Sequence, residues 1–217
     1  YQVVKKAINL DWWRMQNDFE DTERLMINKY WDNLTDYFNG ATLNALCMVD
    51  TSGSMMGDPI NIAISIGLYC AERAKGPFAN HYISFSSAPQ LIECSGVDFC
   101  DKVQRIYQTN LCQNTNIKAG FDMLLDTAIK HHMKQEDLPH NIIIISDMQV
   151  NCADRRFARY EATLMEDIRR EWAVAGYKMP HLIYWNANAC EDTILDNGPD
   201  VSYVSGASPT IFESILT

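Results

Sequence analysis

Short apolar runs alternate with amphipathic stretches along most of the chain. Residues 43–49, 141–146 and 181–185 are almost wholly apolar, as strands buried on both faces of a parallel sheet should be. Residues 201–204 predict a further strand, and 81–86 with 90–93 predict a hairpin that turns at Ser87-Ala88-Pro89. Between these runs, apolar residues recur every three or four positions and predict helices at 60–74, 98–108, 117–128, 160–172 and 209–216.

The first 40 residues have a helical pattern without strands. From Leu25 to Phe38 the apolar residues fall three or four positions apart, and Asn39-Gly40 then ends the predicted helix. We therefore expect residues 1–40 to be an N-terminal helical extension, packed on a domain that spans 41–217.

The order of these elements predicts the fold class. Buried strands that alternate with amphipathic helices are typical of an α/β protein with a mostly parallel, doubly wound sheet covered on both faces. We predict about six strands, five parallel and one, from the hairpin, antiparallel at an edge.

Composition narrows the class of partner. The chain of 217 residues has a formal net charge of −10 and no run of Lys or Arg, which disfavours direct nucleic-acid binding by this part of the protein. No apolar run is long enough to cross a membrane. Because the sequence begins at Tyr1 without Met, we expect it to be a piece of a longer protein.

The seven cysteines form no Cys-x-x-Cys pair. We favour free thiols in a reducing, cytoplasmic setting, with Cys47 and Cys70 in the core. A disulfide from Cys94 or Cys100 to Cys112 is the alternative. The histidine pair at 131–132 has no metal-ligand spacing and is expected at a helix end.

Two predicted strands end in aspartate, and the first continues into a hydroxyl-rich loop. Asp50 follows Val49, Asp147 follows Ser146, and Ser52 and Ser54 flank Gly53. The carboxyl ends of parallel strands share one edge of the sheet, where ligands bind in such folds. Carboxylate and hydroxyl oxygens are hard ligands that suit Mg²⁺ or Mn²⁺, and less well Ca²⁺.

The segment Asp50-Thr51-Ser52-Gly53-Ser54 resembles the D-x-S-x-S core of the metal-ion-dependent adhesion site in von Willebrand factor A-like domains. Thr115 and Asp147 match the threonine and the second aspartate of that site in the same order. The resemblance implies that Ser52, Ser54 and Thr115 bind the ion directly, while Asp50 and Asp147 act largely through water.

Simpler structural roles remain open for each of these residues. Asp50 to Ser54 could form only a helix-capping turn, Thr115 could only cap the helix at Ile117, and Asp147 could be a turn residue.

A second resemblance rests on Ser146-Asp147-Met148-Gln149, Gly176-Tyr177, Pro180, Tyr184-Trp185-Asn186 and Ser205-Gly206. These segments are similar to an uncharacterised family of viral and plant proteins. Its A-like domain resembles the C-terminal domain of the Ro ribonucleoprotein (TROVE) family. Asn186 could reach the metal edge of the sheet or only form a turn.

These features predict a binding module without enzymatic activity. A partner protein or peptide would fill an open position on the ion with an acidic group. One alternative is a protein-contact domain of a Ro-like RNA-handling assembly, in which other parts of the full-length protein bind the nucleic acid. Another is a metal-dependent phosphohydrolase, but the sequence shows no phosphate loop and no G-x-S-x-G elbow.

Overall fold

The computed structural model describes residues 1–14, 21–37, 44–84, 88–108, 116–147, 155–188, 193–196 and 200–206. Its helices are α1 (Gln2–Arg14), α2 (Asp21–Asp32), α3 (Asp58–Arg73), α4 (Phe99–Gln108), α5 (Ile117–Lys130) and α6 (Arg155–Val174), with short 3₁₀ turns at Gly53–Met55 and Gln135–Asp137. Its strands are β1 (Ala45–Val49), β2 (His81–Ser84), β3 (Leu91–Glu93), β4 (Asn141–Ser146), β5 (His181–Asn186), β6 (Thr193–Asp196) and β7 (Val201–Ser205).

These strands form one twisted sheet in the order β3-β2-β1-β4-β5-β7-β6. The five central strands are parallel, and β3 pairs antiparallel with β2 at one edge. The predicted fold class, a mostly parallel α/β sheet with an antiparallel edge strand, is confirmed. The structure adds β6, which pairs antiparallel with β7 at the other edge and was not predicted.

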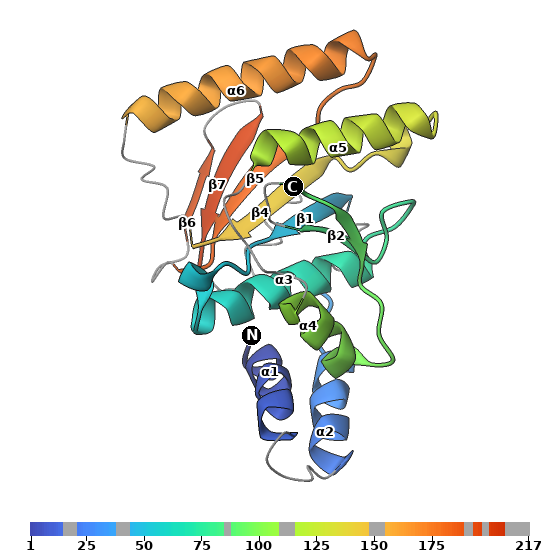
Figure 1. The fold of residues 1–217 in the computed structure, drawn as a ribbon, viewed down its shortest axis with the longest axis vertical. Coiled ribbons are helices and arrows are strands. Elements are labelled where there is room, and N and C mark those ends of the chain that lie inside the picture. The colour runs from blue at the N-terminus through green and yellow to red at the C-terminus, as the bar shows by residue number, and fades with distance from the viewer. Residues whose placement is uncertain are drawn as a thin grey trace.

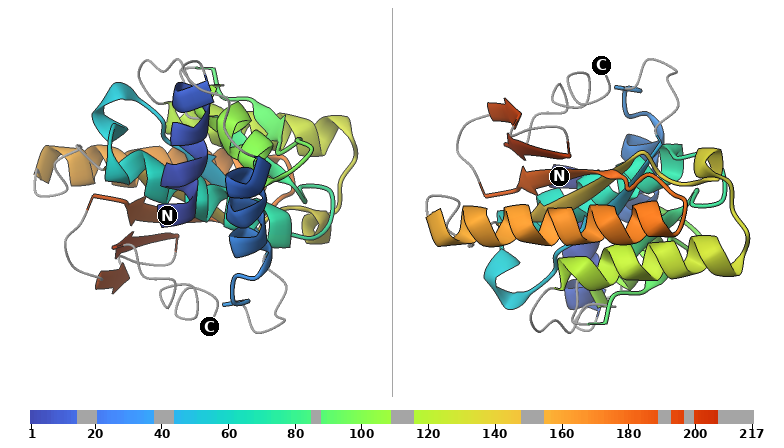
Figure 2. Two further views of the ribbon diagram at one scale, coloured as in Figure 1. Left: turned by 90° about the horizontal axis from the view of Figure 1, so that it is seen from below. Right: turned by 90° about the horizontal axis from the view of Figure 1, so that it is seen from above.

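Helices cover both faces of the sheet. Figure 1 shows α5 and α6 on one face and α3 with α4 on the other, and the view from above in Figure 2 shows α5 and α6 lying across the sheet. The strand β1 separates two apolar cores, because its side chains alternate. Cys47 and Val49 pack on the α3 side, whereas Leu46 and Met48 pack on the α5 side.

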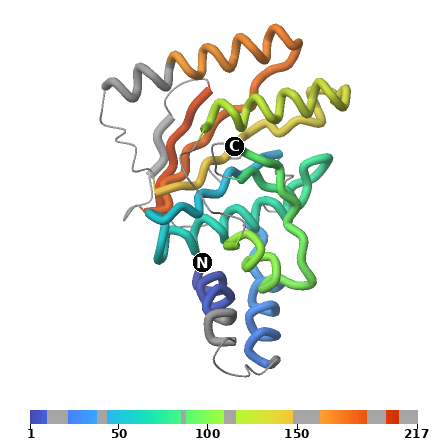
Figure 3. Tube along the Cα trace, viewed as in Figure 1, coloured from blue at the N-terminus to red at the C-terminus, as the bar shows by residue number. Residues whose placement is uncertain are grey.

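The N-terminal extension consists of two helices. Figure 3 shows α1 and α2 (blue) on the α3 side of the molecule, with α2 beside α4. Val4 and Ala7 of α1 are fully buried. Trp31 of α2 stacks on Phe99 of α4, with ring centroids 4.2 Å apart. The extension therefore shares the core of the α/β domain.

Polar contacts also hold α2 in place. Arg24 donates two hydrogen bonds of 2.7 Å to the carboxylate of Asp98, and Asn28 donates a third of 2.7 Å. These contacts lower the pKa of Asp98 to about 2. Trp31 donates through Nε1 to Glu72 at 2.7 Å.

The cysteines, the last predicted helix and the end of α5 can be compared with the sequence predictions. Cys47, Cys70, Cys94 and Cys100 are buried and form no disulfide within the described part of the chain, whereas Cys112 lies outside it. The predicted final helix at 209–216 also lies outside it. His131 forms the C-cap of α5, as the sequence indicated. Among the described helices, none is long and apolar enough to cross a membrane.

Candidate metal site at the carboxyl end of the sheet

Asp50 and Asp147 lie at the same edge of the sheet. Strands β1 and β4 are parallel neighbours with Val49 opposite Ile145, so the aspartates follow the two strands at their shared carboxyl end. Both residues are buried, with 2% of Asp50 and 8% of Asp147 exposed. The folded chain thus places two buried aspartates directly after neighbouring strands, at the same end of the sheet.

The loop after β1 brings its two serine hydroxyls together. Ser52 Oγ and Ser54 Oγ are 3.1 Å apart, within hydrogen-bond distance. Ser52 starts the 3₁₀ turn at Gly53–Met55, but its side chain makes no capping hydrogen bond. The N-cap of α3 is Gly57, which has no side chain. The alternative that Asp50 to Ser54 form only a helix-capping turn thus finds no capping hydrogen bond from the Ser52 side chain.

Asp50 is held by two donors. Its Oδ1 accepts a hydrogen bond from the backbone N–H of Ser52 at 2.8 Å, and its Oδ2 accepts one from the Ser146 hydroxyl at 2.6 Å. The backbone N–H of Asp50 donates to the carbonyl of Ile145 at 2.9 Å. These contacts fix the direction of the carboxylate.

Asp147 differs from Asp50 in its contacts. Its Oδ2 is buried and has no hydrogen-bond partner among the described residues. Neither Asp147 nor Asp50 forms an ion pair within that part of the chain. A buried carboxylate oxygen without a donor or a cation is costly. This oxygen therefore fits an ion or water bound at the edge of the sheet.

Thr115 lies outside the described residues, so its place relative to the other four predicted ligands is not described. Its neighbour Asn116 is the N-cap of α5, because Asn116 Oδ1 accepts a hydrogen bond from the N–H of Ala119 at 3.0 Å.

Asn186 adopts the turn role. Its Oδ1 accepts a hydrogen bond from the N–H of Asn188 at 2.9 Å, which is typical of an Asx turn. This contact supports the turn role that the sequence left open for Asn186, which is a neutral amide, and we do not include it among the candidate metal ligands.

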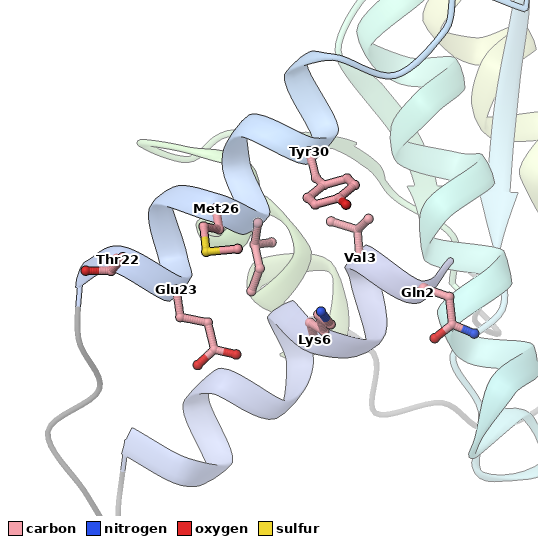
Figure 4. A pocket seen from close by; sticks show the side chains of 8 residues that line it. Gln2, Val3, Lys6, Thr22, Glu23, Met26 and Tyr30 are labelled. Carbon is pink, nitrogen blue, oxygen red and sulfur yellow. The ribbon is translucent and has the colours of Figure 1, made fainter.

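Other kinds of site fit less well. Across the described ranges, no three His, Cys, Asp or Glu side chains gather in an arrangement that could hold a metal ion by themselves. Figure 4 shows a pocket of about 500 Å³ between α1 and α2, where Tyr30 lies next to Val3. Glu23 is the one carboxylate in its lining. The edge at Asp50 and Asp147 therefore remains the better candidate for a cation.

Comparison with known proteins places the chain in a family. A family model described as a domain of unknown function, DUF7788, matches residues 44–217. The chain belongs to this family. The matched segment of the DUF7788 domain begins just before β1 and includes all five residues predicted to bind metal. The N-terminal helices α1 and α2 precede it.

The DUF7788 chain is also similar to an uncharacterized protein of Acanthamoeba polyphaga mimivirus. The two are 29% identical over 196 residues, which cover 88% of this chain and 34% of the viral protein. The chain therefore spans about a third of the length of that relative. Neither comparison states a ligand or an activity.

Proposed function

We propose that this DUF7788 domain is a binding module that holds a divalent cation, Mg²⁺ or Mn²⁺, at the carboxyl end of β1 and β4. The ion would bind an acidic group of a partner protein or peptide. The observation that carries the proposal is the buried Oδ2 of Asp147, which has no partner within the described residues. Asp147 follows β4, and a second buried aspartate, Asp50, follows the neighbouring strand β1.

The ligand chemistry supports a hard ion. The candidate ligands are the hydroxyls of Ser52 and Ser54, the carboxylates of Asp50 and Asp147, and Thr115 through the resemblance to von Willebrand factor A-like domains. Oxygen ligands of this kind suit Mg²⁺, which keeps several waters in its shell. With Asp50 and Asp147 acting largely through water, the direct ligands would be neutral hydroxyls, which leave the ion's positive charge largely in place. An acidic group of a partner could then bind the ion at an open position of its shell.

The electrostatics of the fold support a cation at this place. Two like charges at the ends of neighbouring strands repel each other, and this repulsion is stronger near a protein surface than in bulk water. No positive side chain among the described residues pairs with either aspartate. A divalent ion would remove this repulsion and give Asp147 Oδ2 a partner.

Metal-dependent thermal stability tests the proposal. Mg²⁺ at about 100 times its Kd should stabilise the folded protein by about 2.7 kcal/mol, a rise in Tm on the order of 5–10 °C for a chain of this size. Asp50→Ala should abolish the rise while the protein stays folded. Asp58→Ala is the matched control, because Asp58 lies just beyond the loop but is exposed and paired with Lys5 at 3.0 Å.

Calorimetric titration with Mg²⁺ and Mn²⁺ then measures binding directly. An equal metal response in the parent and in Asp50→Ala would place the site elsewhere and refute the proposal. Metal-dependent hydrolysis of a phosphate ester by the parent, lost in Asp50→Ala, would show an enzyme in place of a binding module.

A further inference from the structure

Ser146 joins the two halves of the candidate site. It is the last residue of β4, directly before Asp147, and only 8% of it is exposed. Its hydroxyl donates to Asp50 Oδ2 at 2.6 Å across the sheet. The parallel register between β1 and β4 brings these residues together, because Val49 lies opposite Ile145. A hydroxyl on one strand thus orients the carboxylate that follows the next strand.

The hydrogen bond limits what Asp50 can do. The N–H of Ser52 already binds Oδ1 at 2.8 Å, so with Ser146 on Oδ2 the carboxylate is held at both oxygens. Rotation toward an ion would break at least one of these bonds. Each oxygen can still accept a hydrogen bond from water. Asp50 is therefore arranged to meet an ion through water.

We propose that Ser146 is a positioning residue that makes the site selective for Mg²⁺ over Ca²⁺. The inference rests on the proposed function. Mg²⁺ requires near-octahedral geometry and keeps its waters, whereas Ca²⁺ accepts six to eight oxygens and often takes a carboxylate directly, through one or both oxygens. An Asp50 carboxylate that is held in place supports the octahedral, water-rich shell of Mg²⁺. A carboxylate released at Oδ2 can rotate and supply the additional direct ligands that suit the larger ion.

The test compares Ser146→Ala with Ser146→Thr, which keeps the hydroxyl. Calorimetric titration of each protein with Mg²⁺ and, separately, with Ca²⁺ gives two dissociation constants. In Ser146→Ala we expect the Kd for Mg²⁺ to rise about tenfold, the lower end for loss of an outer hydrogen bond at a metal site. The Kd for Ca²⁺ should stay within about twofold or fall. Ser146→Thr should retain the selectivity of the parent.

If Ser146 had a purely structural role, its loss would weaken the binding of both ions to a similar extent, because a disordered metal site binds neither ion well. Parallel losses in Ser146→Ala, or no change for either ion, would therefore overturn the inference while the parent's Mg²⁺ binding still supports the proposed function. Failure of the parent to bind either ion would overturn the proposed function and this inference with it. Circular dichroism of the metal-free proteins checks that each variant is folded.

Discussion

Two glycines let helices approach β1 closely from opposite faces, and they give a matched test of the packing. A Cβ added at Gly67 of α3 would overlap Cγ2 of Val49 and lie 3.7 Å from its Cβ. A Cβ added at Gly120 of α5 would overlap only the terminal Cε of Met48. Val49 is stiff because it branches at Cβ, whereas Met48 has three rotatable bonds and can move aside. The same substitution should therefore have different costs at the two positions.

The magnitudes follow from two opposing effects. Replacing Gly with Ala inside a helix stabilises it by about 1 kcal/mol. Overpacking a tight core costs about 1–3 kcal/mol, and we assign this cost to Gly67→Ala, because Val49 is fully buried. The net free energy of unfolding should fall by about 0–2 kcal/mol in Gly67→Ala. It should rise by about 1 kcal/mol in Gly120→Ala, because Met48 can move aside.

Guanidinium denaturation followed by circular dichroism measures both variants, and the gap between them should be about 1–3 kcal/mol at similar denaturant slopes. Val49→Ala provides a second check, because it removes the methyl groups that a Cβ at position 67 would meet. In that background Gly67→Ala should become neutral or stabilising, which is a coupling between neighbours. Equal stabilities for the two alanine variants, or additive effects in the double variant, would refute this account of the packing.

Three further predictions concern α2 and the buried thiols. Asp98 contributes stability that is present above its ordinary pKa of 3.8 and is lost as the pH falls toward its folded pKa of about 2. Between about pH 5 and 2, the free energy of unfolding should therefore fall more steeply with pH in the parent than in Asp98→Asn. Equal pH dependence in the two proteins would contradict the pairing with Arg24. Trp31→Ala should lower the free energy of unfolding by about 3–5 kcal/mol, measured by urea denaturation, and a loss below about 1 kcal/mol would mean that stacking on Phe99 does not anchor α2. The four buried cysteines, Cys47, Cys70, Cys94 and Cys100, should resist a thiol reagent in the native protein and react in denaturant, as mass spectrometry can show. Burial excludes the reagent and raises the pKa of Cys94 to about 12; rapid labelling of the native protein would contradict their burial.

The sequence predicted the central strands and helices well because their signals are local. A strand covered on both faces must be apolar throughout, so Ala45–Val49 and Asn141–Ser146 are recognisable without knowledge of their neighbours. The aspartates that follow them, and the Ser-Gly-Ser segment after Asp50, also belong to the chain itself. The pattern alone therefore predicted the fold class. It also placed four of the five candidate ligands at one edge of the sheet.

Elements that depend on distant partners were less visible. Strand β6, Thr193–Asp196, is four residues long and is stabilised by pairing with β7, so its own residues carry little signal. Helix α1 has a weak apolar period, and Val4 and Ala7 are buried because the helix packs on α3 and α4. Such contacts depend on the tertiary arrangement and leave no clear pattern within one segment.

The chemistry of the candidate site divides in the same way. The sequence by itself determined which side chains end the strands, namely two aspartates with serines beside them. Only the tertiary structure decided that Ser146 binds Asp50, two residues 96 positions apart, and that Asp147 Oδ2 is left without a partner in the described part of the chain. The physical reason is the register between β1 and β4, which is set by backbone hydrogen bonds and core packing across the whole sheet and selects which hydroxyl reaches which carboxylate.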